Sequence, residues 1–181
     1  MLRTRRRLPW SPGYDSAVAP AKTVAASQVT LVQLMEITDT NLGGIVHGGV
    51  IMKLVDTAAG LAAIKHAGRM CVTVSMDEMS FLAPAHIGDT ITVLASVNDV
   101  GNTSLEVGVR VESEELRTGK RTHTSSAYLV YVALDEDGKP RPVPPIVAET
   151  ADEQRRQREA RIRRETRKAH RAAIEQERRR D

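Results

Sequence analysis

The sequence predicts an α+β domain in which a curled antiparallel sheet of about five strands wraps around one long central helix. Three observations lead to this fold class. The segment 50–66 is apolar and free of proline over a length that favours a buried helix over a strand. One segment before it and four segments after it have the alternation typical of strands. A helix that is apolar nearly all round needs cover on every side, so we expect the sheet on one side and a second subunit over much of the rest.

The chain before the helix divides into three parts. Residues 1–27 combine arginines, prolines and alanines without periodicity, so we expect a flexible N-terminal arm. A first strand is predicted to begin near Ser27 and to end at Asp39. The segment 40–49 is a glycine-rich turn that leads into the helix, and we expect Gly68 to end that helix.

The chain after the helix alternates Val, Thr and Ser between breaks that are rich in turn-forming residues. We expect four strands in an antiparallel meander, at about 71–82, 90–98, 103–113 and 121–134. The domain is predicted to span 28–147. The remainder, 148–181, is charged and lacks an apolar stripe, so we expect a tail that is a solvent-exposed helix or partly disordered.

The formal net charge of +3 is unevenly distributed. The four arginines of residues 3–7 and the segment 149–181 contribute +4 each, whereas 8–148 carries −5. An acidic core between basic ends argues against nucleic acid as a partner. Cys71 is the single cysteine, which excludes an intramolecular disulfide, and no apolar run is long enough for a signal peptide or a membrane span. We therefore expect a cytoplasmic protein.

Asp56 lies two turns into the apolar helix, where an ionised carboxylate without partners would be costly. Two interpretations stay open: Asp56 faces a crevice and fixes the helix through a neighbouring group, or it takes part in chemistry.

The segment before the helix favours the second interpretation. Asn41 brings an amide side chain, and Gly48 and Gly49 bring bare peptide groups to the helix start. The first N–H groups of a helix carry partial positive charge and can hold an oxyanion, although glycines also serve ordinary tight turns. We place His47 with the two glycines as a substrate-binding residue and assign it no proton transfer.

Three runs together carry a resemblance to a known family. They are NLGGIVHGGVIMKLVD at 41–56, TVSMDEMSFLAP at 73–84 and ALDEDGKPRPVP at 133–144. In order and spacing the chain resembles the cytosolic acyl-CoA hydrolases, which are thioesterases of the hotdog fold. The resemblance implies a hotdog domain that hydrolyses fatty acyl-CoA to a free fatty acid and CoA.

The resemblance also implies an active site shared between two subunits. Asp56 on the helix of one subunit and Asn41 from the loop of its partner match the family's catalytic positions. A homodimer would thus own two complete sites, and related bacterial enzymes are often trimers of dimers. Asp56 would act as a general base on water or as a nucleophile that forms an anhydride, and Asn41 would orient the water or hold the thioester.

Substrate contacts follow in the same way. The family's CoA lies along the turn after Gly101, where Asn102, Thr103 and Ser104 supply hydrogen bonds. This turn has no basic residue. The phosphate contacts are left open among Arg69, Arg117, Lys120 and Arg121.

For the acyl tail we expect Met79 and Phe81, with Met76 and Leu82 as further candidates, although core packing explains each equally well. No metal and no cofactor besides the CoA of the substrate is expected, because the histidines and Cys71 show no ligand spacing.

Two competing functions remain. A hotdog hydratase would need a histidine paired with a carboxylate, and His47 lies nine positions from Asp56 without the usual His-x-x-Pro-Gly signature. The other is a non-enzymatic acyl-CoA sensor whose basic arms contact DNA or a protein. The sensor does not need both Asn41 and Asp56, so we favour the thioesterase.

Overall fold

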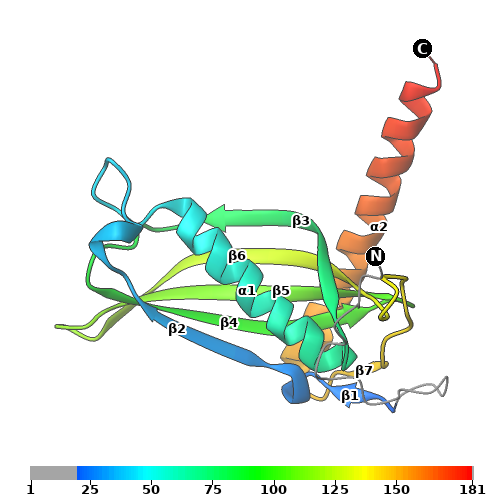
Figure 1. The fold of residues 1–181 in the computed structure, drawn as a ribbon, viewed down its shortest axis with the longest axis horizontal. Coiled ribbons are helices and arrows are strands. Elements are labelled where there is room, and N and C mark those ends of the chain that lie inside the picture. Colours follow the sequence, from blue (N-terminus) through cyan, green and yellow to red (C-terminus); the bar gives the residue numbers. More distant parts are fainter. Residues whose placement is uncertain (1–19, 181) are drawn as a thin grey trace, which may run out of the picture.

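The computed structural model describes residues 20–180, so the expected arm falls outside the described residues over 1–19. A five-stranded antiparallel sheet curls around a long helix, which confirms the predicted α+β class (Figure 1). The elements are β1 (Lys22–Thr23), the 3-10 helix η1 (Ala25–Ser27), β2 (Val29–Leu34), the 3-10 helix η2 (Ile37–Asp39), α1 (Gly48–Ala67), β3 (Cys71–Phe81), β4 (Asp89–Val100), β5 (Ser104–Glu115), β6 (Lys120–Ala133), β7 (Ile146–Val147) and α2 (Ala151–Arg178).

The sheet has the order β2-β4-β5-β6-β3, and each neighbouring pair is antiparallel. The expected strand ranges agree closely with the observed ones after α1, but the expected four-strand meander is wrong. β4, β5 and β6 follow one another as hairpins, whereas β3 lies at the edge beside β6. Local alternation predicts strands without saying which strands are neighbours, because pairing depends on contacts between distant segments.

Helix α1 fills the concave side of the sheet (Figure 1). Four alanines on its buried side are fully enclosed: Ala58, Ala59, Ala62 and Ala63. Their short side chains let the helix backbone lie close to the strands. Gly68 ends the helix as expected, with a φ of 68°. Met52 and Leu61 stay exposed on the other side, where the sequence predicts cover by a second subunit.

Two boundaries on the N-terminal side differ from the expected ones. β2 ends at Leu34 rather than at Asp39, because the Asp39 carboxylate accepts the Glu36 N–H at 2.8 Å and turns the chain into η2. Residues 20–27 belong to the folded unit rather than to an arm, since β1 pairs with β7 and Val24 is buried.

His66 joins the C-terminal end of α1 to the segment before β7. Its side chain is fully buried, and Nε2 lies 3.0 Å from the Pro144 carbonyl oxygen, so the neutral ring can donate its Nε2 proton there. Burial lowers the pKa of His66, although the contact with Pro144 opposes this effect. Within residues 20–180 the Nδ1 atom has no hydrogen-bond partner, so a charged ring would bury an unsatisfied donor.

This histidine predicts a loss of stability in mild acid. Below about pH 6.5 His66 is protonated in the unfolded state, whereas in the folded state its lowered pKa keeps the ring neutral. The free energy of unfolding should therefore decrease as the pH is lowered, by at most about 1.4 kcal/mol per pH unit. His66→Gln keeps a donor near the Nε2 position without titrating, and it should flatten the curve between about pH 5 and 7. Urea unfolding at several pH values measures both slopes, and equal slopes would contradict the assignment.

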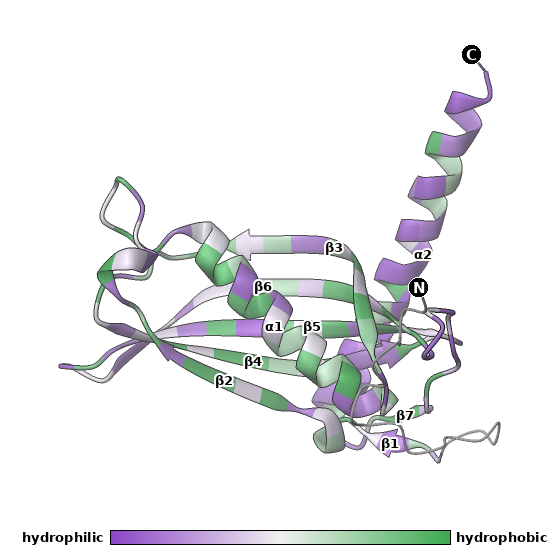
Figure 2. Ribbon diagram, in the orientation of Figure 1, coloured by the Kyte–Doolittle hydropathy of each residue, from purple (hydrophilic) through white to green (hydrophobic). Residues whose placement is uncertain are grey.

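Helix α2 crosses the outer face of the sheet and runs on past the edge formed by β3 (Figure 1). It is strongly hydrophilic along its length, in contrast to α1 (Figure 2). Its first half packs on the sheet, with Ala160 fully buried, whereas every residue from Lys168 to Arg180 is exposed. The expectation of a solvent-exposed or disordered tail is therefore wrong for the first half.

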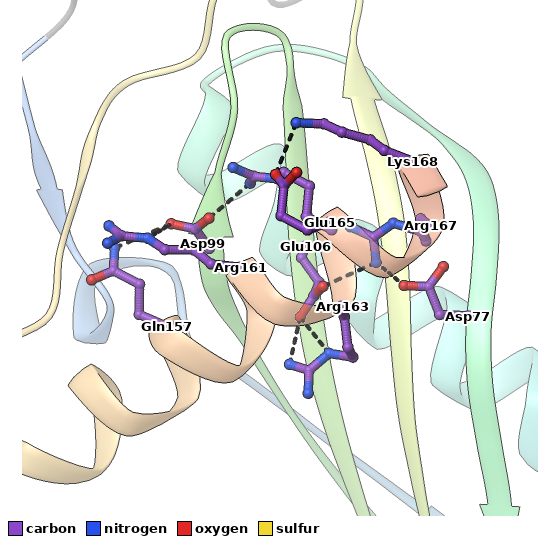
Figure 3. A network of polar contacts seen from close by, with 10 residues as sticks. Asp77, Asp99, Glu106, Gln157, Arg161, Arg163, Glu165, Arg167 and Lys168 are labelled. Atoms are coloured by element: carbon purple, nitrogen blue, oxygen red, sulfur yellow. Dashed lines mark hydrogen bonds and ion pairs between the residues drawn. The ribbon is translucent and has the colours of Figure 1, made fainter. Parts of the chain in front are cut away.

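Ion pairs to buried carboxylates hold this first half in place (Figure 3). Arg163 donates to Glu106 Oε1 from Nε at 3.1 Å and from a terminal nitrogen at 2.7 Å, and its guanidinium lies 3.6 Å from the centre of the Tyr128 ring. Arg167 bridges Glu106 and Asp77. Burial raises the pKa of Glu106, and its arginine partners oppose that shift.

A β-bulge supplies the neighbouring carboxylate. The pairing of β4 with β5 shifts by one residue between Val97 and Asp99, so Asn98 and Asp99 are both buried in succession. Asp99 forms an ion pair with Arg164 at 2.8 Å and accepts a hydrogen bond from Gln157 at 3.2 Å. Charge complementarity thus replaces the apolar stripe that the sequence of α2 lacks.

Removal of the Glu106 charge should loosen α2. In Glu106→Gln the guanidinium groups of Arg163 and Arg167 face an uncharged amide, which should cost on the order of 3 kcal/mol of unfolding free energy. Urea unfolding and hydrogen exchange of the α2 amides measure the effect. Glu165→Gln, which breaks an exposed pair with Lys168, is the matched control and should leave both readouts near wild type. Equal protection of α2 in the two variants would contradict this role of Glu106.

Candidate active site

Asp56 lies on the open side of α1, and its side chain is exposed in the protomer rather than enclosed by its apolar neighbours. Its Oδ1 atom accepts one hydrogen bond from the Thr73 hydroxyl at 2.7 Å and another from the Tyr131 hydroxyl at 2.8 Å. An accessible carboxylate held by two donors suits either a general base or a nucleophile.

The sequence did not identify Tyr131 and gave Thr73 no role. The two residues are direct partners in the register of β3 and β6. Tyr131 is buried, and this burial raises the pKa of its phenol. The Asp56 carboxylate raises the pKa further, whereas a hydrogen bond with Thr73 lowers it. One feature of the sequence could have pointed to Tyr131: it is a tyrosine at an inward position of an apolar strand, and a buried phenol needs a hydrogen-bond partner.

Asn41 lies in the loop before α1, which projects beyond the start of the helix (Figure 1). Its Oδ1 accepts the Gly43 N–H at 2.8 Å, and its own N–H donates to the Ile45 oxygen at 2.9 Å. Gly44 completes the turn with a φ of 75°. The side chain of Asn41 therefore shapes its own loop in the protomer through its Oδ1 atom.

The start of α1 is capped by His47. Its Nδ1 accepts the Gly49 N–H at 2.9 Å, and its carbonyl oxygen accepts the Val50 N–H at 2.9 Å. The expectation that both Gly48 and Gly49 offer N–H groups to an oxyanion is therefore wrong for Gly49 in this conformation, because His47 already occupies that donor. The Gly48 N–H takes no part in the cap. A Cβ on Gly48 would lie 3.4 Å from the Phe81 ring, so this ring packs against the start of α1.

The expected site residues thus fall at two ends of one protomer. Along α1, Asp56 lies eight residues after Gly48, or about 12 Å. Asp56, Thr73 and Tyr131 form what we call the Asp56 cluster. Tyr131 pairs with Leu105, so the turn formed by residues 102–104 lies at the same end of the sheet as this cluster. Phe81 pairs with Ser125 at the opposite end of β3, near Gly48. A single protomer does not bring the Asn41 loop and Asp56 together.

The expected acyl-tail residues differ in their packing. Met76 and Met79 are partly buried against the core, as the packing interpretation allows, whereas Phe81 and Leu82 are exposed to 54% and 58%.

The four basic candidates for phosphate contacts lie at opposite ends of the sheet. Arg69 lies two residues before β3. This end of the sheet also holds the Asn102 turn, because the Ala133 N–H at the end of β6 donates to the Thr103 oxygen. Arg117, Lys120 and Arg121 lie at the other end, in and beside the β5–β6 hairpin, where Arg121 pairs with Glu114 at 2.7 Å. The register therefore favours Arg69.

Residues 20–180 contain no group of three or more His, Cys, Asp or Glu side chains arranged to hold a metal ion. Neither helix of this part of the chain is both long enough and apolar enough to cross a membrane.

Comparisons with known proteins find thioesterases and acyl-CoA hydrolases among the relatives of this chain. A family model described as the thioesterase superfamily matches residues 43–120. VdlD of Helicobacter pylori is 38% identical over 80% of this chain and 83% of its own length. An uncharacterized acyl-CoA thioester hydrolase of Bacillus subtilis, YkhA, is 42% identical over 64% of this chain and 67% of its own. The mouse cytosolic acyl coenzyme A thioester hydrolase is 40% identical over 74% of this chain, which spans 36% of that relative's length.

Two solved structures are similar over their whole length. A hexameric acyl-CoA thioesterase in the apo form has a TM-score of 0.83 and 39% identity, covering 85% of this chain and 99% of its own. The Staphylococcus aureus acyl-CoA hydrolase with butyryl coenzyme A, coenzyme A and coenzyme A disulfide has a TM-score of 0.81 and 34% identity, covering 87% and 96%. Its solved variants replace by alanine an aspartate, an asparagine fifteen positions earlier and a threonine seventeen positions later. The chain belongs to the hotdog-fold acyl-CoA thioester hydrolases of the thioesterase superfamily.

Proposed function

We propose that this protein hydrolyses acyl-CoA thioesters to a free carboxylic acid and CoA, with Asp56 as the residue that acts on the thioester. The observation that carries the proposal is the accessible Asp56 carboxylate, fixed at one oxygen by Thr73 and Tyr131. The S. aureus variants support the choice of residues, because Asn41 and Thr73 stand at the same spacings from Asp56, fifteen before and seventeen after.

The reaction exchanges the C–S bond at the carbonyl carbon for a C–O bond, and the net movement of protons is from water to the CoA sulfur. As a general base, Asp56 takes a proton from water while the water oxygen bonds to the carbonyl carbon, and the C–S bond then breaks to release the CoA thiolate, which is protonated. As a nucleophile, Asp56 bonds to the carbonyl carbon itself, expels the thiolate and leaves an anhydride for water to cleave. Both routes place negative charge on the carbonyl oxygen, and the Gly48 N–H at the helix start is the donor that we assign to it.

A second copy of the chain completes the site in this proposal. Each protomer holds an Asp56 cluster at one end and the Asn41 loop at the other. A two-fold axis across the length of α1 sets two identical chains antiparallel, so it can bring the Asn41 loop of one subunit beside Asp56 of the other. CoA then follows the turn of Asn102, Thr103 and Ser104, with Arg69 near its phosphates, and the acyl tail lies along Met79 and Phe81.

Substitution of the two central residues tests the activity. Asp56→Asn and Asn41→Ala should each lower kcat about 10²-fold or more while acyl-CoA still binds, because both act on the transition state. Release of CoA from short, medium and long acyl-CoAs, followed with a thiol-reactive dye, measures the rates. Asp152→Asn, at an exposed position in the first turn of α2, is the matched control and should keep wild-type rates. If the natural chain binds acyl-CoA but releases no thiol from any substrate, the thioesterase hypothesis fails and the non-enzymatic acyl-CoA sensor takes its place.

Mixed oligomers test the shared site. If Asp56 and Asn41 act across an interface, unfolding and refolding an equal mixture of Asp56→Asn and Asn41→Ala subunits should restore about a quarter of the wild-type sites, since half of the dimers are hybrids with one intact site. Activity of the mixture no higher than that of either variant alone would place both residues in one subunit's site.

A further inference from the structure

We infer that Tyr131 is a positioning residue that clamps Asp56 by Oδ1, so that Oδ2 is the carboxylate oxygen that acts on water or on the thioester. This inference rests on the proposed function and deepens it. It assigns a role to a residue on β6 that contacts Asp56 and no other predicted catalytic group.

The hydrogen bonds around Asp56 are one-sided. The Thr73 and Tyr131 hydroxyls both reach Oδ1, at 2.7 Å and 2.8 Å, whereas Oδ2 accepts no hydrogen bond within residues 20–180. A carboxylate with one oxygen saturated by donors keeps the lone pairs of the other for a reacting group. The Tyr131 hydroxyl also lies 3.0 Å from the Asp56 backbone oxygen, so the side chain and the helix backbone share one anchor.

The local packing fixes the phenol in this position. Tyr131 is 2% exposed, and its ring lies against α1 at Gly60, one turn after Asp56. A Cβ on Gly60 would lie 3.7 Å from the ring carbon Cε1 and 3.8 Å from the hydroxyl, which are ordinary van der Waals distances, so the ring packs directly against the helix at this position. An aromatic ring with two rotatable bonds holds its hydroxyl with little loss of freedom, which suits an orienting role.

The phenol cannot substitute for Asp56 in the proton transfer. Burial and the nearby carboxylate raise the pKa of Tyr131, so the phenol is a neutral hydrogen-bond donor at neutral pH. Its contribution is therefore to orientation of the carboxylate, and its loss should affect turnover rather than substrate binding.

Tyr131→Phe separates this role from packing, because the ring is kept and one hydroxyl is lost. We expect kcat to fall about 10- to 100-fold, as for the loss of a hydrogen bond to a charged group, with KM within about twofold of wild type. Tyr128→Phe is the matched control: this tyrosine lies three positions earlier on the same strand, beneath Arg163, and its loss should leave kcat unchanged.

A kcat of Tyr131→Phe within about twofold of wild type overturns the inference, and so does a parallel rise of KM with a lowered melting temperature. If Tyr131→Phe does not fold, Thr73→Val and Thr73→Ser test the other hydrogen bond to Oδ1. A lower kcat in Thr73→Val than in Thr73→Ser supports the clamp, and equal kcat values in these two variants reject it. Absence of CoA release by the natural chain would instead remove the proposed function itself, which keeps the two failures distinct.

Discussion

The contact between α1 and the curled sheet governs the rest of the structure. Alanines at the buried face of the helix allow the strands to close around it, and this packing fixes the rotation of the helix about its own axis. Asp56 and Gly60 then lie over Tyr131, while Gly48 lies against Phe81. The polar and apolar parts of the candidate site are therefore set by the same rotation of the helix.

Strand β3 is braced on both of its faces, because its register with β6 is shifted between Thr73 and Ser75 and again between Met76 and Glu78. These β-bulges break the regular alternation, so Thr73 and Asp77 face opposite sides of the sheet although they are four positions apart. On the inner face Thr73 donates to Asp56, and on the outer face Asp77 pairs with Arg167 of α2. An edge strand has a partner on one side only, so these side-chain contacts supply order that a second neighbouring strand would otherwise give. The hydrophilic helix α2 thus connects the periphery of the fold to the strand that orients Asp56.

The sequence predicted the parts of this molecule that depend on local pattern. Periodicity located α1 and the strands after it, and the family resemblance selected Asp56 and Asn41. The same patterns did not place β3 at the sheet edge or dock α2, because these features depend on partners far away in the chain. Tyr131 reaches Asp56 across 75 positions, and Arg167 reaches Glu106 across 61. Single residue types carry no signal for such pairs, and only the inward position of Tyr131 hinted at a buried hydrogen bond.

Symmetry offers a physical reason for a site divided between the two ends of one protomer. An isologous dimer whose two-fold axis crosses the length of α1 sets the subunits antiparallel, with each end of one beside the opposite end of the other. Two half-sites on one chain then become two complete sites without any further residue. A head-to-tail arrangement would instead leave one half-site open at each end of a filament. On the proposed function, the dimer is therefore part of the catalytic machinery, and the exposed Met52 and Leu61 of α1 mark the side of the helix that a partner would cover.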